Sequence, residues 1–287
     1  MIKNNYSIDI VYHYNQYSQL ENVESITNKL NIITKSNSNI RFNLVLVGIK
    51  KNLNQLLVKK INKMTSAYRL EFNSFVKVVD NKYENNLSQI YKLGSKVLDN
   101  SSSKTLFING NPATLIDIIA YTFTTPSDFI SFKLVDGLTK LVKYDGYSIS
   151  NNIDKGYYNI NIVGYDEFYD KSKVDNSLTI FSNFFNSNLF AVRSDLLNFL
   201  FKSESQFFFD IETSINIIKH NLDCRHITGV GFEMDRIELH SSYMYDRASV
   251  YAKEFDNINK LIRENIDLIS CREPIQKYSE KEELLIV

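Results

Sequence analysis

Glycine and proline are scarce in this sequence, which has nine glycines and three prolines among 287 residues. Average proteins use roughly 12% of their positions for these two residue types. Collagen-like order is therefore excluded, and neither flexible linkers nor Pro-rich docking segments are expected. Cysteine is equally scarce, and Cys224 and Cys271 show no paired spacing. This excludes a disulfide framework and a zinc ribbon, and it favours a reducing compartment.

Neither sign of charge is in excess, because 33 Lys and Arg balance 33 Asp and Glu. Without a net positive field the chain has no general means of holding a phosphate backbone, so we expect no nucleic acid partner. No stretch approaches the ~20 apolar residues needed to cross a bilayer, and residues 1–16 lack the apolar core of a signal peptide. The expected location is the cytoplasm, with peripheral association at the inner face of the membrane left open.

The residues that are present describe a folded protein, with 44% hydrophobic and 23% charged residues. The first half alternates β-rich runs with stretches whose apolar residues recur every three or four positions, which predicts strands followed by amphipathic helices. The predicted strands are Ser7–Tyr12, Asn43–Val47, Ser74–Val79 and Thr105–Ile108, and the predicted helices cover 20–30, 53–64 and 87–98. Strands separated by such helices indicate a parallel sheet covered on both faces.

The second half has a different pattern. Between Ser131 and Val192 the β-rich segments are short and alternating, as in antiparallel strands or hairpins. The predicted helices are Asp195–Phe201, Asp210–His220 and a long amphipathic one from Phe255 to Ile269. We therefore predict an α/β fold, with a mixed sheet flanked by helices and a helical C-terminal extension. The extension is expected to pack on the body, with dimerisation and membrane contact as alternatives.

This order of elements resembles the GT-A fold of glycosyltransferases, and family 2 in particular. The resemblance spans 6–241 and is carried by IDIVYHYNQYSQLENVESI, LVLVG at 44–48, SKTLFINGNPATL and FFDIETSINIIKHNLDCRHI. It implies a GT-A-like, Rossmann-type mixed sheet in one domain at 1–245, followed by the extension at 246–287. Within the domain it implies a nucleotide-sugar-binding half at 1–125 and an acceptor half at 126–245.

Two of the three acidic positions typical of that family carry other residues here. Gly48 stands where the resemblance implies a base-binding Asp, and Asn109-Gly110-Asn111 stands in place of the metal-binding Asp-x-Asp. An amide oxygen is neutral and is a weaker ligand for a divalent cation than a carboxylate. We therefore expect no certain cofactor, and at most weak binding of Mn²⁺ or Mg²⁺.

Asp210 is the candidate catalytic residue. The resemblance implies that it opens the acceptor-side helix and is the general base that deprotonates the acceptor hydroxyl. The residue type and position fit a second interpretation equally well, in which Asp210 is an N-cap that accepts hydrogen bonds from the first amides of the helix. Glu212 is expected to be a first-turn charge favoured by the helix dipole.

Polar and aromatic residues follow two predicted strands at the edge where α/β sheets bind ligands. We predict that they line a donor site, in which rings stack on a nucleotide base and polar groups hydrogen-bond to it. These residues are Tyr12, His13, Tyr14, Asn15, Asn109 and Asn111. The alternatives are that Asn-Gly-Asn-Pro is only a turn, and that the aromatic turn packs on its neighbours.

Two further residues are weaker candidates. Arg193, at the end of a predicted strand, has the fork geometry that binds a donor phosphate, although a solvated surface charge explains it as well. His240 lies where the resemblance implies a histidine that completes a metal shell, and an ordinary histidine is the alternative.

The function predicted from these residues is glycosyl transfer. The chain lacks the Gly-rich dinucleotide, Walker and Gly-x-Ser-x-Gly motifs. We predict an inverting, hexosyltransferase-type glycosyltransferase that moves a sugar from a nucleotide-sugar donor to a carbohydrate or lipid-linked acceptor in surface polysaccharide assembly. The alternative is a catalytically silent GT-A-like subunit that binds glycan or serves an assembly. The missing acids favour the silent subunit, whereas Asp210 and the Asn pair favour the enzyme.

Overall fold

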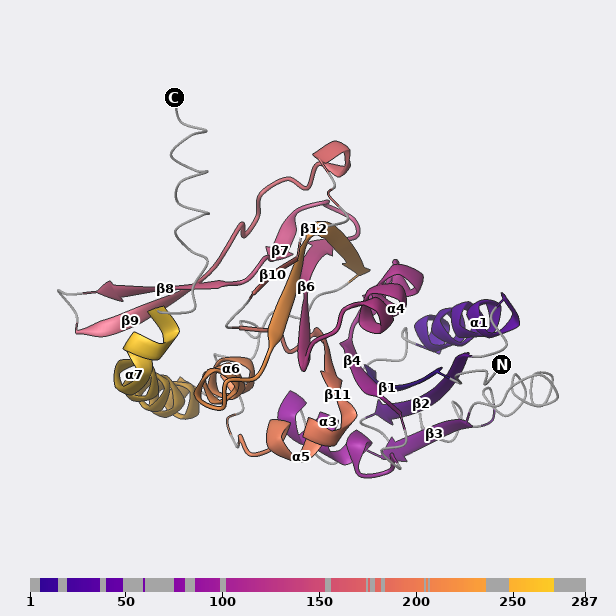
Figure 1. The fold of residues 1–287 in the computed structure, drawn as a ribbon, viewed down its shortest axis with the longest axis horizontal. Helices are drawn as coiled ribbons and strands as arrows, with labels where there is room; N and C mark the ends of the chain where they lie inside the picture. Colours follow the sequence, from indigo (N-terminus) through magenta and orange to yellow (C-terminus); the bar gives the residue numbers. More distant parts are fainter. Residues whose placement is uncertain are drawn as a thin grey trace.

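The computed structural model describes residues 6–14, 20–36, 40–48, 59, 75–80, 86–98, 102–152, 156–173, 175, 179–181, 184–203, 205, 207–235 and 248–270. Within these ranges one ten-stranded sheet runs through both halves of the chain, and a two-stranded sheet accompanies it. Helices lie on both faces of the large sheet (Figure 1). The predicted α/β fold is confirmed.

The first half of the sheet is parallel, in the order β4-β1-β2-β3. Its strands are β1 (Tyr6–Tyr14), β2 (Ile40–Gly48), β3 (Phe75–Asp80) and β4 (Lys104–Asn109). These bounds confirm the four strands predicted from the β-rich runs. The helix predicted over 53–64 lies outside the described residues.

Helices cover both faces of this half, which explains why β1, β2 and β4 are apolar on both sides. The helices α1 (Leu20–Ser36) and α4 (Leu115–Thr124) pack on one face, and α3 (Leu87–Ser95), α5 (Leu197–Leu200) and α6 (Phe209–Lys219) pack on the other. Successive residues of one strand therefore enter different cores: Ile10 of β1 joins the core with α1, and Val11 joins the core with α3.

The second half of the sheet is mixed. Here β11 (Leu189–Arg193) lies between β4 and β6 (Phe129–Asp136) and is antiparallel to both, whereas β12 (Cys224–Asp235) is parallel to β6. The remaining elements are β5 (Asn111–Pro112), β7 (Val142–Tyr144), β8 (Tyr147–Asn152), β9 (Tyr157–Ile162), β10 (Thr179–Phe181) and the 3₁₀ turns η2 (Lys171–Lys173) and η3 (Ser194–Leu196). The β6–β7 pair is an antiparallel hairpin of the kind that the alternating pattern predicted, and β9, also predicted, pairs with β8 in a second hairpin.

The helix α4 and the strand β8 are among the elements that the sequence did not predict. The helix α4 was missed because its sequence, LIDIIAYTFT, is too uniformly apolar to show a stripe of period 3.6. The strand β8 was missed because its sequence, YSISNN, is mostly polar, and the strand pairs only with β9 outside the large sheet. The predicted helix Asp195–Phe201 is a 3₁₀ turn followed by the single helical turn α5.

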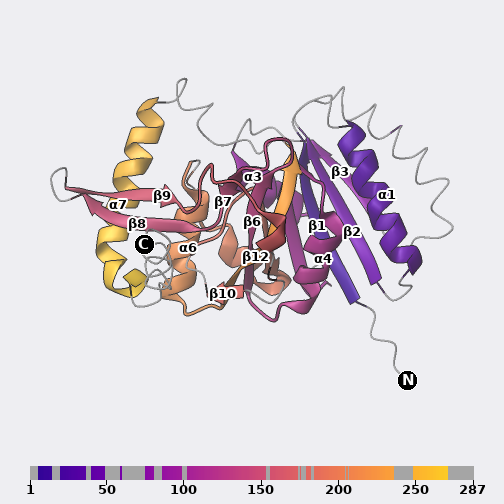
Figure 2. The same cartoon turned by 90° about the horizontal axis from the view of Figure 1, so that it is seen from above.

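The C-terminal helix α7 (Ala248–Ser270) packs against α6 and the β8–β9 hairpin, at the end of the molecule opposite α1 (Figure 2). Its buried Ile258, Ile262 and Ile269 share a core with Ile211 and Ile215 of α6. This arrangement confirms the predicted amphipathic helix and its packing on the body.

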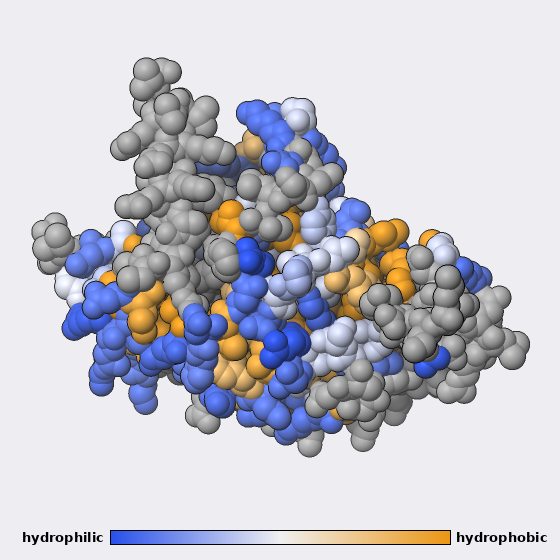
Figure 3. Space-filling model, viewed as in Figure 1, coloured by the Kyte–Doolittle hydropathy of each residue, from blue (hydrophilic) through white to orange (hydrophobic). Residues whose placement is uncertain are grey.

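The described helices are too short or too polar for any of them to cross a membrane. On the face drawn in Figure 3, hydrophobic residues gather in separate areas over α6 and α7 and over α4, with hydrophilic residues between them. The visible part of this face therefore carries no continuous apolar surface.

Candidate functional site

His13 and Asn109 meet at the carboxyl edge of the parallel strands. Asn109 is the last residue of β4, and His13 is the last but one of β1. The two strands lie side by side in parallel, with His13 directly opposite Asn109. The His13 Nδ1 and Asn109 Oδ1 atoms are 2.9 Å apart, and the two residues are only 2% and 5% exposed. The structure thus brings together one residue from each of the two predicted donor segments.

The Asn109 side chain continues into a chain of amides. Its Nδ2 donates to Asn188 Oδ1 at 2.8 Å, and Asn188 Nδ2 donates to Asn186 Oδ1 at 2.9 Å. The Asn109 backbone N–H also donates to the Asn188 carbonyl at 2.7 Å. Since Asn109 Oδ1 is left as an acceptor, the ring nitrogen of His13 that faces it carries hydrogen. The segment Phe184–Asn188 therefore lies against the edge that the sequence pointed to.

The other predicted donor residues differ in their surroundings. The Tyr12 ring is fully buried in the core with α1, so it packs rather than faces a ligand. Asn111 is half-buried in β5, where its backbone pairs with Asp235 of β12. Gly110, between the two asparagines, has φ +115°, a conformation that strongly favours glycine and that turns the chain from β4 into β5. The Tyr14 side chain and all of Asn15 lie outside what the structure describes.

Asp210 is the second residue of α6 and is not its N-cap, a position that belongs to Phe208. The N-cap interpretation is therefore wrong about the position, although the carboxylate does accept one amide of the first turn. The carboxylate is 2% exposed. Its Oδ1 accepts the N–H of Ile211, and its Oδ2 accepts the hydroxyl of Tyr147, each at 2.9 Å. The N-terminal end of the helix dipole favours the negative charge at this position.

Tyr147 reaches Asp210 from the start of β8. Burial, and next to it the negative charge of Asp210, raise the pKa of Tyr147 well above its ordinary value. Its hydroxyl therefore keeps its proton and remains a donor throughout the physiological pH range. The Tyr147 ring packs edge to face on Tyr144, with centroids 5.1 Å apart, and burial likewise raises the pKa of Tyr144.

The segment Phe184–Asn188 also contacts the acidic helix. The Phe185 N–H donates to Ser214 Oγ at 3.3 Å, and that hydroxyl donates to the Asp210 carbonyl at 2.6 Å. The Tyr144 hydroxyl donates to the Phe184 carbonyl at 3.1 Å. One buried segment thus touches Asn109 through its Asn188 end and the Asp210 helix through its Phe185 end.

Arg193 and Glu212 lie apart from this arrangement. Arg193 pairs with Lys104 at the amino end of β4, whereas Asn109 is at the carboxyl end of that strand. The two residues therefore lie at opposite ends of the strands. Arg193 forms ion pairs with Asp128 and Asp195. Glu212 accepts the Ser203 hydroxyl at 2.6 Å. His240 lies outside the described residues.

The described side chains at this edge do not fit a divalent cation. Within the described ranges there is no group of three or more His, Cys, Asp or Glu residues that could hold a metal. The amide oxygen and nitrogen of Asn109 are both engaged inside the protein, by His13 and Asn188. Neutral ligands already bonded in this way are poor partners for a hard cation.

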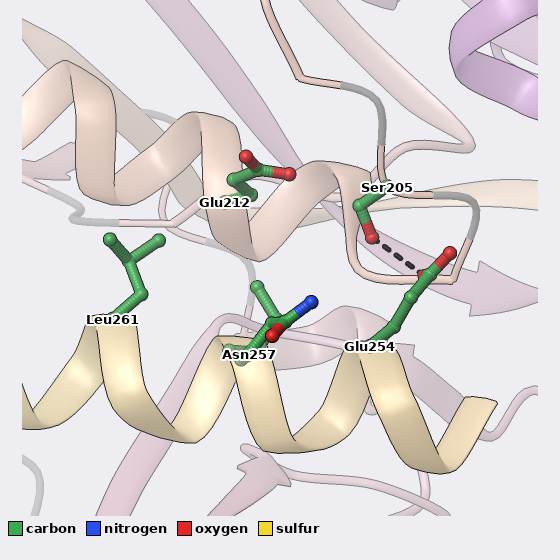
Figure 4. Close-up of a pocket in the computed structure, with 6 residues that line it drawn as sticks. Ser205, Glu212, Glu254, Asn257 and Leu261 are labelled. Atoms are coloured by element: carbon green, nitrogen blue, oxygen red, sulfur yellow. Dashed lines mark hydrogen bonds between the residues drawn. The ribbon is translucent and has the colours of Figure 1, made fainter. Parts of the chain in front are cut away.

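A cavity of about 360 Å³ lies between α6 and α7, away from the carboxyl edge (Figure 4). Two glutamates line it, and both carboxylates are bonded to the chain itself. Glu254 accepts the Ser205 hydroxyl at 2.8 Å and the Phe207 N–H at 2.9 Å, and Glu212 is bonded to Ser203 as described above. These bonds tie the segment before α6 to α7, which explains the glutamates without a ligand.

No family model and no curated protein sequence matches this chain. Solved structures similar to it include a mannosyltransferase from Pyrobaculum calidifontis in complex with GDP-Man and Mn²⁺, at 11% identity and a TM-score of 0.48, which covers 83% of this chain and 60% of that one. A 4-diphosphocytidyl-2C-methyl-D-erythritol synthase from Anaerococcus prevotii has 11% identity and a TM-score of 0.48, covering 86% of this chain and 97% of that one. The catalytic domain of Drosophila β1,4-galactosyltransferase 7 has 9% identity and a TM-score of 0.43, covering 83% and 73%. These likenesses assign neither an activity nor a ligand to the chain.

The amide chain predicts different costs for replacing the two asparagines of Asn-Gly-Asn. Asn109→Ala leaves buried polar groups of His13 and Asn188 without their partner, so we expect the free energy of unfolding to fall by about 1–3 kcal/mol. The half-buried Asn111 is the matched control, and Asn111→Ala is expected to cost less than ~1 kcal/mol. Urea denaturation of both variants measures the difference, and equal losses would contradict the network.

Proposed function

We propose that this protein transfers a glycosyl group from a nucleotide-sugar donor to a hydroxyl of a carbohydrate or lipid-linked acceptor, with inversion at the anomeric carbon. The observation that carries the proposal is the buried Asp210 carboxylate, which Tyr147 holds at the start of α6. One buried segment connects that helix to the polar carboxyl edge. An acidic residue and a ligand edge brought together in this way fit the task of a transferase.

The donor is assigned to the carboxyl edge. Open α/β sheets bind ligands beyond the carboxyl ends of their strands, where loops diverge. Here β1 lies between β2 and β4 and is parallel to both. The strand on the other side of β4, β11, is antiparallel to it, so the strand direction changes beside Asn109. In this proposal His13 and Asn109 shape the edge, and the half-buried Asn111 of β5 is assigned to the donor.

Asp210 is assigned the role of general base. Its carboxylate is held at the start of α6 by the Ile211 N–H and by the Tyr147 hydroxyl. The acceptor hydroxyl oxygen attacks the anomeric carbon, and its proton passes to Asp210. The bond from that carbon to the donor phosphate breaks, and its electron pair leaves with the phosphate. A single displacement of this kind inverts the configuration.

The second candidate function is a catalytically silent subunit that binds glycan or serves an assembly. The observation that favours it is at Asn109, which carries an amide whose oxygen and nitrogen are both bonded inside the protein. This position therefore supplies no carboxylate that could share a cation with a diphosphate. In that case the edge would keep its shape without supporting transfer.

Replacing Asp210 by Asn tests catalysis against structure. The amide oxygen still accepts the Ile211 N–H but no longer takes the acceptor proton. We expect the free energy of unfolding to change by about 1 kcal/mol, while transfer falls by about 100-fold or more. The assay measures nucleotide release from a panel of nucleoside-diphosphate sugars. Glu212→Gln, on the same helix, is the control and should retain activity. Full transfer by Asp210→Asn would remove it as the base.

Nucleotide binding is expected to be independent of divalent cations. A ligand that binds only the native state raises the melting temperature by mass action. We expect one or more nucleoside diphosphates to raise it, and we expect the shift to survive EDTA, because neutral amides line the edge. A shift that vanishes with EDTA and returns with Mn²⁺ would show that other ligands form a metal site. The absence of any shift would favour the silent subunit.

A further inference from the structure

The turn between β7 and β8 is held by a buried carboxylate that the proposed reaction does not use. Asp145 is 7% exposed and lies two residues before Tyr147. Its Oδ1 accepts His226 Nε2 at 2.9 Å and Thr228 Oγ1 at 2.7 Å, and its Oδ2 pairs with Lys133 Nζ at 2.8 Å. We call these four residues the Asp145 cluster.

The partners of Asp145 come from two neighbouring strands of the large sheet. Lys133 belongs to β6, and His226 and Thr228 belong to β12, which pairs with β6 in parallel. Asp145 itself is in a turn, so its three bonds attach that turn to two strands that each have neighbours on both sides. Because three donors converge on one carboxylate, the position of the turn is more tightly defined than a single ion pair would make it.

The geometry after Asp145 leads directly to Asp210. Gly146 has φ +110°, a conformation that other residues rarely adopt, and it sets the direction in which the chain leaves the cluster. Tyr147 follows, with its ring against Tyr144 and Phe184 and its hydroxyl on Asp210. Tyr144, on the other side of Asp145, packs edge to face on the His226 ring, with centroids 5.7 Å apart.

Filling this part of the core with polar side chains is energetically unfavourable compared with filling it with apolar ones. Burying a charged pair and an imidazole costs desolvation energy that well-packed apolar side chains would not incur. The His226 ring is fully buried, and its Nδ1 has no hydrogen-bond partner among the described residues. A gain in the free energy of unfolding therefore does not explain the cluster. Holding one turn in a single position does explain it.

We infer that Asp145, Lys133, His226 and Thr228 are positioning residues, which hold the Tyr144–Tyr147 turn so that the Tyr147 hydroxyl orients the Asp210 carboxylate. The inference rests on the proposed role of Asp210 in transfer. The contact between Tyr147 and Asp210 is nevertheless measurable in the absence of any substrate.

The test records the ¹³Cζ resonance of Tyr147 in protein labelled at tyrosine, assigned by its loss in Tyr147→Phe. Asp210→Asn gives the position of this resonance without the carboxylate. Thr228→Val removes one bond to Asp145 and keeps its shape, and Asp145→Asn weakens all three. We expect both to move the resonance toward its position in Asp210→Asn. Thr122→Val is the control, because Thr122 is a buried threonine of α4 that donates to Ile118 and should leave the resonance in place.

Transfer kinetics give the second readout. We expect Thr228→Val to lower kcat by about 10- to 100-fold, the scale of a misplaced catalytic group, and to change KM for the donor by less than about twofold. A Tyr147 resonance that stays in place in a folded Thr228→Val or Asp145→Asn protein would overturn the inference. If Asp145→Asn does not fold, Thr228→Val decides the outcome. If wild-type protein transfers no sugar, the proposed function fails, and the resonance still tests the positioning.

Discussion

The buried segment Phe184–Asn188 is the constraint on which the candidate site depends. Its polar groups lie inside the protein, where each unpaired donor or acceptor would cost about 1–3 kcal/mol. They are paired with groups from β4 at one end and from α6 at the other. Because the chain then continues directly into β11, between β4 and β6, the segment fixes the Asp210 helix relative to the edge that carries Asn109.

The same network gives a physical reason for an amide at position 109. Asn109 accepts from His13 and donates to the carbonyl oxygen of the Asn188 side chain. A carboxylate only accepts, so an aspartate here would lose the donor and place its charge against an acceptor oxygen. The amide at position 109 is therefore matched by a partner residue in the fold.

Much of the fold was predictable from local pattern. The four parallel strands were predicted because their β-rich runs are separated by stretches of helical period, and α6 and α7 were predicted because their apolar residues follow that period. The helix α4 is apolar almost throughout, so its pattern did not separate helix from strand. The meeting of His13 with Asn109 was predictable, since the carboxyl ends of adjacent parallel strands lie at one edge.

The rest of the site was not predictable, because it depends on contacts between distant residues. Asn186 and Asn188 are two of many asparagines in the sequence, and only the small polar run between FF and LF marked them. Tyr147 lies 63 positions before Asp210, and local pattern carries no information about that pairing. Arg193 was assigned to the donor from its position at a strand end, but the antiparallel direction of β11 puts that end at the opposite edge. The direction of a strand is set by the tertiary fold and is not visible in its own sequence.

The most direct test of this account follows backbone amides by ¹H–¹⁵N NMR while a nucleoside diphosphate is added. If the carboxyl edge and its buried segment form the ligand site, the amides of Asn109, Asn111 and Asn188 shift first, and those of Arg193 and Glu254 stay in place. Shifts confined to the cavity lined by Glu212 and Glu254, or to the Arg193 edge, would contradict it.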